Sequence, residues 1–207
     1  MGIVRTAARK IVHAPIDILG FDFDNLERKQ LGDHITHLLD HGTASTVTGQ
    51  LITIAGEGTS VECGRQGNVF SLQPSKCKWV DHSWMWNTIT ALEQSDIKIE
   101  NDLLELSMWR ESDYFLMDQI ALLNTFSDSE MKDINVVRLY LKVCNLSDIT
   151  TVDGLTIQQD MMEGRPGHSI SEKAYGCPRI PKSLMACIRT WQQALRLAYT
   201  TVQGLHV

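Results

Sequence analysis

The sequence of 207 residues lacks any uninterrupted apolar run near the ~18 residues of a membrane-spanning helix. No apolar secretory segment follows Met1. Gly2 and Thr6 match a myristoylation pattern, with Arg5, Arg9 and Lys10 as a second membrane signal, but an ordinary helix or extended lead-in is the favoured interpretation, so no contact with a membrane is expected. The five cysteines are odd in number and none stands in a C-x-x-C pair, which favours free thiols over a disulfide framework. Free thiols indicate a reducing compartment, so we expect an intracellular protein, cytoplasmic or nuclear.

Catalytic and cofactor-binding motifs are also missing from the sequence. The glycines of residues 56–67 do not follow a dinucleotide or phosphate-loop spacing, and no Ser-centred elbow or H-E-x-x-H occurs. His37 and His41 are one helical turn apart, but no further residue completes a recognised zinc spacing. The acidic pair Asp22 and Asp24 has the residue type that holds Mg²⁺ in polymerases, yet capping of a helix is the favoured interpretation. We expect no cofactor, no metal and no catalysis by this chain alone.

The charge is unevenly distributed along the chain. The net charge is −6; from Arg165 onward there are six Lys or Arg and one acidic residue, a net charge of +5, which leaves −11 for residues 1–164. This balance excludes a uniformly basic groove. Any contact with nucleic acid would have to be local, through Arg5, Arg9 and Lys10 or through the basic carboxy-terminal segment.

Residues 112–157 are the most regular stretch, and they predict two amphipathic helices followed by a small hairpin. The first helix is predicted after an N-cap at Ser112, and the second opens at Ser127 with Glu130 at the capping-box spacing. Asp153-Gly154 suits a type I′ turn. In the first helix the apolar positions recur at steps of three and four residues: Phe115, Leu116, Ile120, Leu122 and Leu123. The buried surface of the second is expected to come from Met131, Ile134, Val137, Leu139 and Leu141.

The other segments complete a mainly α fold, a compact helical domain with a small β-hairpin and a C-terminal helix. A helix from Asp24 or Asn25 to His41 is predicted to turn Leu26, Ile35, Leu38 and Leu39 inward. Residues 46–61 fit a strand or a helix, and residues 69–72 fit a short strand. Asp81 is predicted to cap a helix that carries Trp84, Thr88, Ala91 and Leu92 on one side and ends near Gln94. Leu103, Leu104, Leu106 and Trp109 form an apolar patch.

Three segments are predicted from the change in composition near the C-terminus. Residues 1–157 form the helical domain, and the prolines and glycines of residues 158–181 indicate an irregular connector. Residues 182–207 form a last helix and tail, with an apolar stripe of Leu184, Ile188, Trp191 and Leu195.

Several phrases, taken in order, resemble the region after the polymerase palm in reverse-transcriptase-like open reading frames of eukaryotic retroelements. They are ARKIVHAPIDILGFDFDNLERKQLGDHITHLLDHG (residues 8–42), VTGQLI (47–52) and the Trp-rich segment Trp79–Leu92. Next comes Leu106–Ile157, with Arg110, Asp113, Asn135, Arg138, Leu139 and Leu141 in register, and then Pro178, Pro181, Ile188, Trp191, Ala194 and Leu195. The sequence departs from the pattern at Leu19-Gly20, where a Gly-Gly is usual, and at Tyr175-Gly176-Cys177.

The resemblance implies a non-catalytic thumb/connector-like fragment of a retroelement reverse-transcriptase-like protein. The palm with its metal-binding aspartates is not in the sequence, so no catalytic residue carries over. The implied partners are the backbone of an RNA or DNA template–primer and a polymerase palm or other protein. The residues expected to contact phosphates are Arg5, Arg9, Lys10, Arg189 and Arg196, with Trp79 or Trp86 as stacking residues.

The alternative function is a helical protein–protein interaction module with no role at nucleic acid. It would use the Leu184–Leu195 face of the last helix together with an acidic surface. The net charge of −6 favours this alternative, whereas the ordered resemblance favours the first function.

Overall fold

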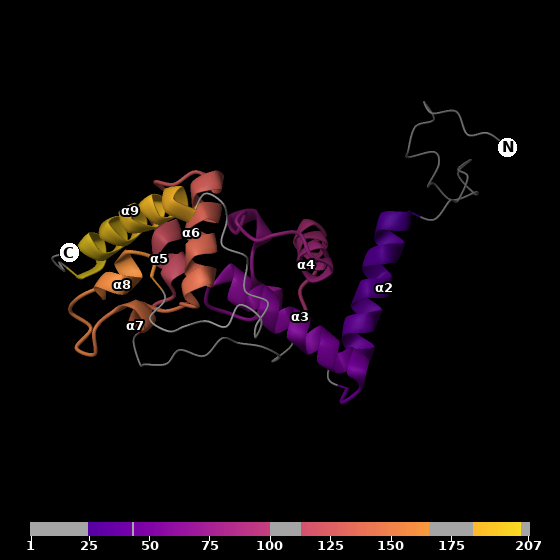
Figure 1. Ribbon diagram of the computed structural model, residues 1–207. Coiled ribbons are helices and arrows are strands. Elements are labelled where there is room, and N and C mark those ends of the chain that lie inside the picture. Colours follow the sequence, from indigo (N-terminus) through magenta and orange to yellow (C-terminus); the bar gives the residue numbers. More distant parts are fainter. Residues whose placement is uncertain (1–24, 43, 100–112, 166–183, 204–207) are drawn as a thin grey trace, which may run out of the picture. The chain divides into compact units, whose positions relative to one another are not determined.

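The computed structural model describes residues 25–42, 44–99, 113–165 and 184–203, and these residues are mainly helical (Figure 1). They contain no strand, only two isolated antiparallel bridges. No helix among them has the length and apolar character needed to cross a membrane. The helices are α2 (Leu26–His41), α3 (Val47–Cys63), α4 (Trp84–Gln94), α5 (Leu116–Leu122), α6 (Asp128–Leu141), α7 (Leu146–Ile149), α8 (Gln159–Met162) and α9 (Leu184–Gln203), with 3₁₀ turns η2 (Val69–Ser71) and η3 (Pro74–Lys76).

The chain forms two compact units, residues 1–52 and 53–207. The division predicted from composition, at residues 157 and 181, does not coincide with this boundary, because α9 belongs to the second unit and packs on α6. The predicted apolar patch at residues 103–109 lies outside the described part of the chain.

The first unit contains α2, which begins and ends where the sequence predicts. The Asn25 side chain accepts hydrogen bonds from the backbone N–H groups of Glu27 and Arg28, and the helix ends at Gly42. The prediction that Leu26 and Leu39 face inward is wrong, since they are 77% and 64% exposed. Only Leu38 of this helix is buried, and Leu39 lies 100° further round the helix axis.

Residues 47–63 form the helix α3, which decides the open choice between strand and helix. The Thr46 hydroxyl accepts a hydrogen bond from the N–H of Gly49 and caps the first turn. A Cβ atom at Gly49 would lie 2.0 Å from the carbonyl oxygen of Ala44, so only glycine fits this tight entry to the helix. Helical packing has overridden the strand preference of the β-branched residues here.

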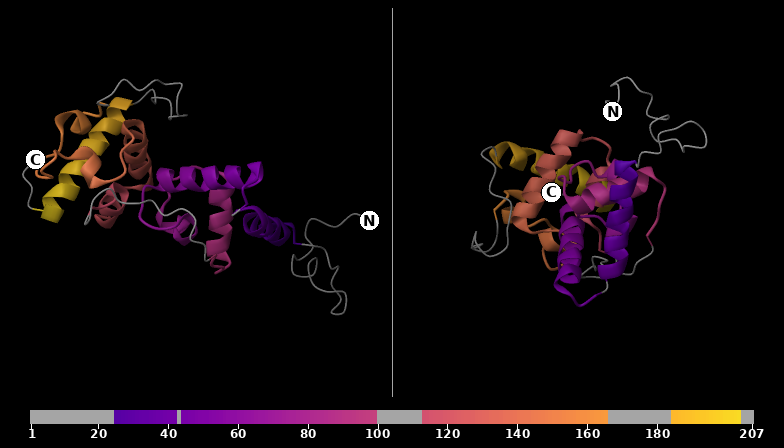
Figure 2. Two further views of the ribbon diagram at one scale, coloured as in Figure 1. Left: turned by 90° about the horizontal axis from the view of Figure 1, so that it is seen from below. Right: turned by 90° about the vertical axis from the view of Figure 1, so that its right-hand side faces the viewer.

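In the second unit α9 lies along α6 and α5, as the ribbon views show (Figures 1 and 2). The predicted stripe of α9 is confirmed at Ile188, Trp191 and Leu195, which are all buried. The indole Nε1 of Trp191 donates a hydrogen bond of 2.9 Å to the carbonyl oxygen of Met161, so α8 is held against α9. The centre of this packing consists of side chains that solvent scarcely reaches: Leu116, Met117, Ile120, Ile134, Val137, Trp191 and Leu195.

The helix α5 is capped differently from the prediction, which placed Ser112 at the N-cap. α5 begins one residue after Phe115, which makes no side-chain cap. Asp113 is buried and its carboxylate accepts hydrogen bonds from the hydroxyl and the N–H of Ser147. The segment before α5 is thereby held against the start of α7, a contact that local sequence signals do not reveal. By contrast, the capping box of Ser127 and Glu130 at α6 is confirmed.

The hairpin predicted at Thr151–Ile157 is reduced to a turn closed by a single bridge between Thr150 and Ile157. Gly154 has a positive φ of 72°, but Asp153 does not, so the turn is not of type I′. The Asp153 carboxylate instead accepts hydrogen bonds from the hydroxyl of Thr151 and the N–H of Leu155. This local side-chain bonding competes with strand pairing.

Two further expectations between residues 69 and 94 are corrected. Residues 69–71 form a 3₁₀ turn instead of a strand, because the Asn68 side chain accepts a hydrogen bond from the N–H of Phe70. The cap of α4 is Ser83, whose hydroxyl accepts from the N–H of Trp86, and not Asp81. Trp84 is 42% exposed, whereas the predicted end of the helix at Gln94 is confirmed.

Candidate functional site

The guanidinium group of Arg138 lies at the centre of a buried polar cluster in the second unit. The side chain is fully buried, with 0% exposure. Its Nη2 donates hydrogen bonds to the carbonyl oxygens of Val61 and Glu62 in the last turn of α3, the second at 2.9 Å. Its Nη1 donates to the carbonyl oxygen of Val143 at 3.2 Å. Arg138 thus joins the end of α3 to the loop that follows α6.

No carboxylate is hydrogen-bonded to this buried cation among the described residues. The carbonyl groups at a helix C-terminus carry a partial negative charge, and those of α3 stabilise the guanidinium in its place. Asn135 supports the arrangement: its amide oxygen accepts from the Arg138 Nε at 2.9 Å, and its amide nitrogen donates to the Glu62 carbonyl at 3.1 Å. Burial lowers the pKa of Arg138 from its ordinary value.

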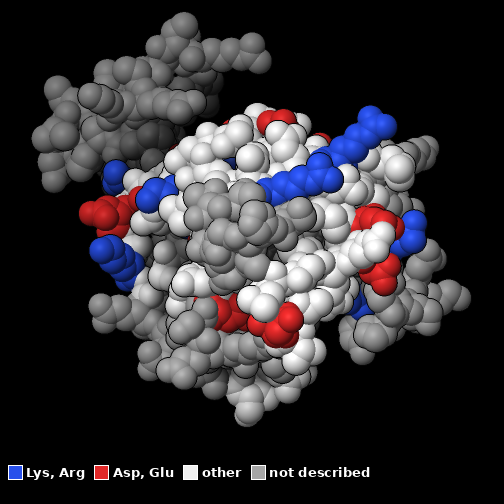
Figure 3. Space-filling view, turned by 90° about the vertical axis from the view of Figure 1, so that its left-hand side faces the viewer, with Lys and Arg blue, Asp and Glu red and all other residues white. Residues whose placement is uncertain are grey.

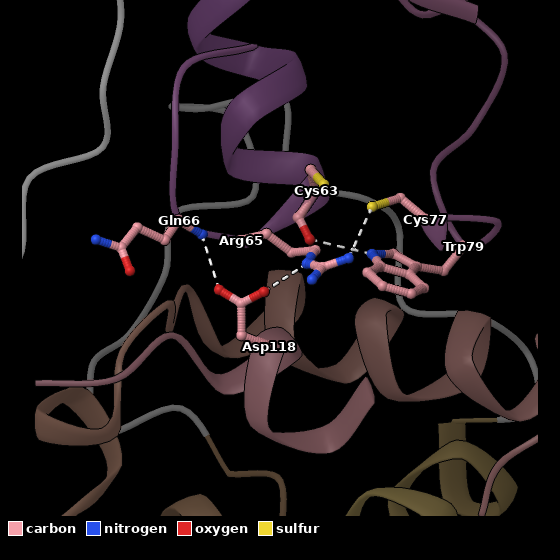
Figure 4. A network of polar contacts seen from close by, with 6 residues as sticks. All are labelled: Cys63, Arg65, Gln66, Cys77, Trp79 and Asp118. Carbon is pink, nitrogen blue, oxygen red and sulfur yellow. Dashed lines mark hydrogen bonds and ion pairs between the residues drawn. The ribbon is translucent and has the colours of Figure 1, made fainter. Parts of the chain in front are cut away.

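A second polar network, drawn in Figure 4, lies just beyond the end of α3. The Arg65 side chain forms an ion pair with Asp118 of α5, and the second oxygen of that carboxylate accepts from the N–H of Gln66 at 2.9 Å. The Arg65 Nη1 also donates to the sulfur of Cys77 at 3.6 Å. Asp118 therefore holds the guanidinium in an orientation that reaches the thiol.

Cys77 is one of two neighbouring thiols in this network. Its partner is Cys63, the last residue of α3, whose sulfur lies beside that of Cys77 (Figure 4). Both are 0% exposed. The neighbouring Cys63 thiol and the guanidinium of Arg65 lower the pKa of Cys77, whereas the neighbouring Cys77 thiol and burial raise the pKa of Cys63. A thiolate is therefore favoured at Cys77 over Cys63.

A small cavity of about 130 Å³ lies beside these elements. Its wall mixes polar and apolar side chains, and it includes Lys76 and Trp79, which stand on either side of Cys77 in the sequence. The volume is far below the ~300 Å³ at which drug-sized ligand pockets begin. The lining residues are Lys76, Trp79, Ile120, Ala121, Asn124, Thr125, Phe126 and Met131.

The basic residues predicted to contact nucleic acid belong to two segments of the chain. Arg5, Arg9 and Lys10 lie outside the described residues. Arg189 and Arg196 are exposed on α9, seven residues apart and on the same side of the helix.

The prediction that Trp79 or Trp86 stacks on bases is corrected by their burial, at 6% and 4% exposure. The Trp79 Nε1 donates to the carbonyl oxygen of Cys63 at 3.1 Å, and the Trp86 ring belongs to the buried side of α4. The apolar residues of the Leu184–Leu195 face predicted for a protein partner are likewise used inside the fold, at Ile188, Trp191 and Leu195.

Several polar residues in the phrases that resemble the retroelement sequences have structural contacts. Asp113 binds Ser147, and Asn135 and Arg138 bind the end of α3. The Asp148 carboxylate accepts from the N–H groups of Cys144 and Asn145. These contacts explain the residue types at those positions without any chemistry at a substrate.

Sequence reasoning missed Cys63, Cys77, Arg65 and Asp118 as members of one cluster. The two cysteines are separated by fourteen positions and follow no ligand spacing. Among the described residues, no group of three or more His, Cys, Asp or Glu side chains is arranged to hold a metal ion. The rings of His37 and His41 are neighbours, with centroids 5.2 Å apart, as their spacing predicts.

The surface drawn in Figure 3 mixes both signs of charge, with Lys and Arg interspersed among Asp and Glu. A phosphate contact on such a surface would be local. Comparison of the chain with protein-family models, with curated proteins and with solved structures found no match.

Proposed function

We propose that this chain is a non-catalytic, thumb/connector-like fragment of a retroelement reverse-transcriptase-like protein that contacts the nucleic-acid backbone through α9. The order of the matching phrases along the chain supports the family assignment. The exposed arginines of α9, Arg189 and Arg196, support the contact.

The outer row of α9 consists of Arg189, Gln193 and Arg196, at helical steps of four and three residues. All three are exposed, while Trp191 and Leu195 on the opposite side are buried. No acidic residue occurs between Leu184 and Gln203, so nothing on the helix opposes an anion. The two arginines are separated by about 10 Å of helix rise.

The salt dependence of binding to a labelled RNA–DNA hybrid tests this function. We expect the double variant Arg189→Ala/Arg196→Ala to bind more weakly and to reduce the slope of log affinity against log salt by about 2, because two phosphate contacts are lost. The control is Arg28→Ala/Lys29→Ala, which removes the same charge from exposed positions of α2. An equal loss in both double variants, or no binding by the unaltered chain at low salt, would contradict a contact made by α9.

A second candidate function, binding of a partner helix, is supported by the outer side of α3. Val47, Leu51, Ile54 and Val61 are between 41% and 73% exposed, and with Gly58 they recur at alternating steps of four and three residues. This is the spacing of a coiled-coil seam. Such a row of apolar side chains indicates an interaction surface.

The charges beside this seam favour a helix with basic flanks over a second copy of the chain. If Ile54 and Gly58 occupy the two apolar positions of the heptad, Glu57 and Glu62 fall at the positions that flank the seam. α3 contains no Lys or Arg. In a parallel pair of α3 helices these two glutamates would face each other across the interface, and like charges there are unfavourable. A partner helix with lysines at its flanking positions would place opposite charges beside both.

Two designed heptad peptides, alike except for lysine or glutamate at the flanking positions, test the second function. We expect the lysine peptide to bind and the glutamate peptide not to bind, measured by calorimetry. Leu51→Ser/Ile54→Ser should abolish binding, and Leu122→Ser, at an exposed leucine of α5, should leave it unchanged. Equal binding of both peptides, or of neither, would contradict a basic partner helix.

A further inference from the structure

The structure assigns a peroxide-reactive dithiol site to Cys63 and Cys77, in which oxidation joins the end of α3 to the turn η3 by a disulfide. Neither the family resemblance nor the outer row of α9 is needed for this inference. It stands on the position of the two sulfurs and on the contact of Arg65 with Cys77.

The arrangement supplies both halves of a dithiol oxidation. The sulfurs of the two thiols lie side by side in Figure 4, although the residues belong to different elements. The Arg65 guanidinium donates to Cys77 at 3.6 Å and is fixed by Asp118. A cation beside a thiol favours the thiolate, which is the nucleophilic form.

The other described cysteines have different surroundings and provide internal controls. Cys144 accepts a hydrogen bond from Arg138 at 3.2 Å, but burial raises its pKa. The Cys187 thiol donates to a carboxylate oxygen of Asp133 at 3.4 Å, so this thiol contacts an anion where Cys77 contacts a guanidinium. Among Cys63, Cys77 and Cys144, the pKa of Cys77 is lowered and the pKa values of the other two are raised.

The reaction needs hydrogen peroxide, or another two-electron oxidant of that class, and it balances in two steps. The Cys77 thiolate attacks one peroxide oxygen and the O–O bond breaks; the departing hydroxide takes up a proton and leaves as water. Cys77 is then a sulfenic acid. The Cys63 sulfur attacks the Cys77 sulfur, the S–O bond breaks, and a second water leaves with the proton of Cys63. Two thiols have lost two electrons and peroxide has gained two.

Access to the buried pair requires only local opening. Cys77 follows η3, a turn of three residues, and local opening of such a segment would cost less free energy than global unfolding. The cavity bounded by Lys76 and Trp79 adjoins this turn. The disulfide would close a loop of residues 63–77 and remove the hydrogen bond between Arg65 and Cys77.

Peptide mapping by mass spectrometry of the full chain, after one equivalent of hydrogen peroxide, tests the inference. We expect a disulfide between Cys63 and Cys77 that dithiothreitol reverses, with Cys144 and Cys187 still reduced. Cys63→Ser should stop at a sulfenic acid on Cys77, trapped by dimedone, and Arg65→Gln should slow the loss of thiols. Cys144→Ser is the matched control and should react as the unaltered chain does.

Two results would overturn the assignment. One is that Cys63 and Cys77 remain thiols in the unaltered, folded chain while other cysteines are oxidised. The other is that Cys77 reacts no faster than Cys187. Since both are measured on the unaltered chain, they remain decisive if the serine variants fold poorly.

Discussion

Replacement of Arg138 by alanine is expected to destabilise the second unit by about 3–5 kcal/mol, as removal of one partner from a buried charged network does. The fully buried guanidinium satisfies the carbonyl groups of Val61 and Glu62 at the end of α3 and that of Val143 after α6. Without it these buried acceptors lose their donors, and each unsatisfied group costs about 1–3 kcal/mol. A cavity would remain as well.

Urea denaturation of the whole chain, followed by circular dichroism, measures this loss. The control is Lys132→Ala, which removes an exposed cation from the same helix and should change the stability by less than about 0.5 kcal/mol. Arg138→Lys should recover little, because an ammonium group cannot reproduce the planar fork of donors. If Arg138→Ala unfolds at the same urea concentration as Lys132→Ala, the end of α3 does not depend on the guanidinium.

Replacement of Gly64 by alanine is expected to cost on the order of 3–5 kcal/mol, from two additive sources. Gly64 has a φ of +64°, and a residue with a Cβ atom pays about 1–2 kcal/mol for the left-handed conformation. The added Cβ would also lie 2.6 Å from Cζ of Arg138, so the guanidinium would have to move away from its carbonyl partners.

Gly58 provides a matched control with the opposite expected sign. It lies inside α3, is exposed, and has nothing within 4 Å of an added Cβ. Alanine there should stabilise the helix by up to about 1 kcal/mol. Combining Gly64→Ala with Arg138→Ala isolates the contact, because the alanine at residue 64 should then cost only the backbone strain of about 1–2 kcal/mol. Equal costs of Gly64→Ala in the two backgrounds would show that the steric contact is unimportant.

Local signals were sufficient to predict several elements. The capping box of Ser127 and Glu130 lies within four residues, and the stripe of Ile188, Trp191 and Leu195 follows helical spacing. The Asn25 cap of α2 is of the same kind. Such interactions form between neighbours in the chain, so the residue types at fixed offsets are enough to reveal them.

Expectations failed where a distant contact outweighed the local signal. Asp113 binds Ser147, 34 residues away, and contributes nothing to the start of α5. The tryptophans at residues 79 and 86 were assigned to stacking, but packing of the second unit buries both. In each case the residue type allowed two roles, and burial decided between them.

The sequence by itself determined that the chain is mainly helical, where several of its helices begin and end, and which side of α9 is apolar, because these properties depend on residues a few positions apart. Only the tertiary structure decided that Arg138 caps α3 from α6 and that Cys63 and Cys77 form a pair beside Arg65. The physical reason is that these groups lie fourteen to seventy-seven positions apart in the sequence. Packing of the chain brings such groups together, and no periodic pattern in the sequence predicts these contacts.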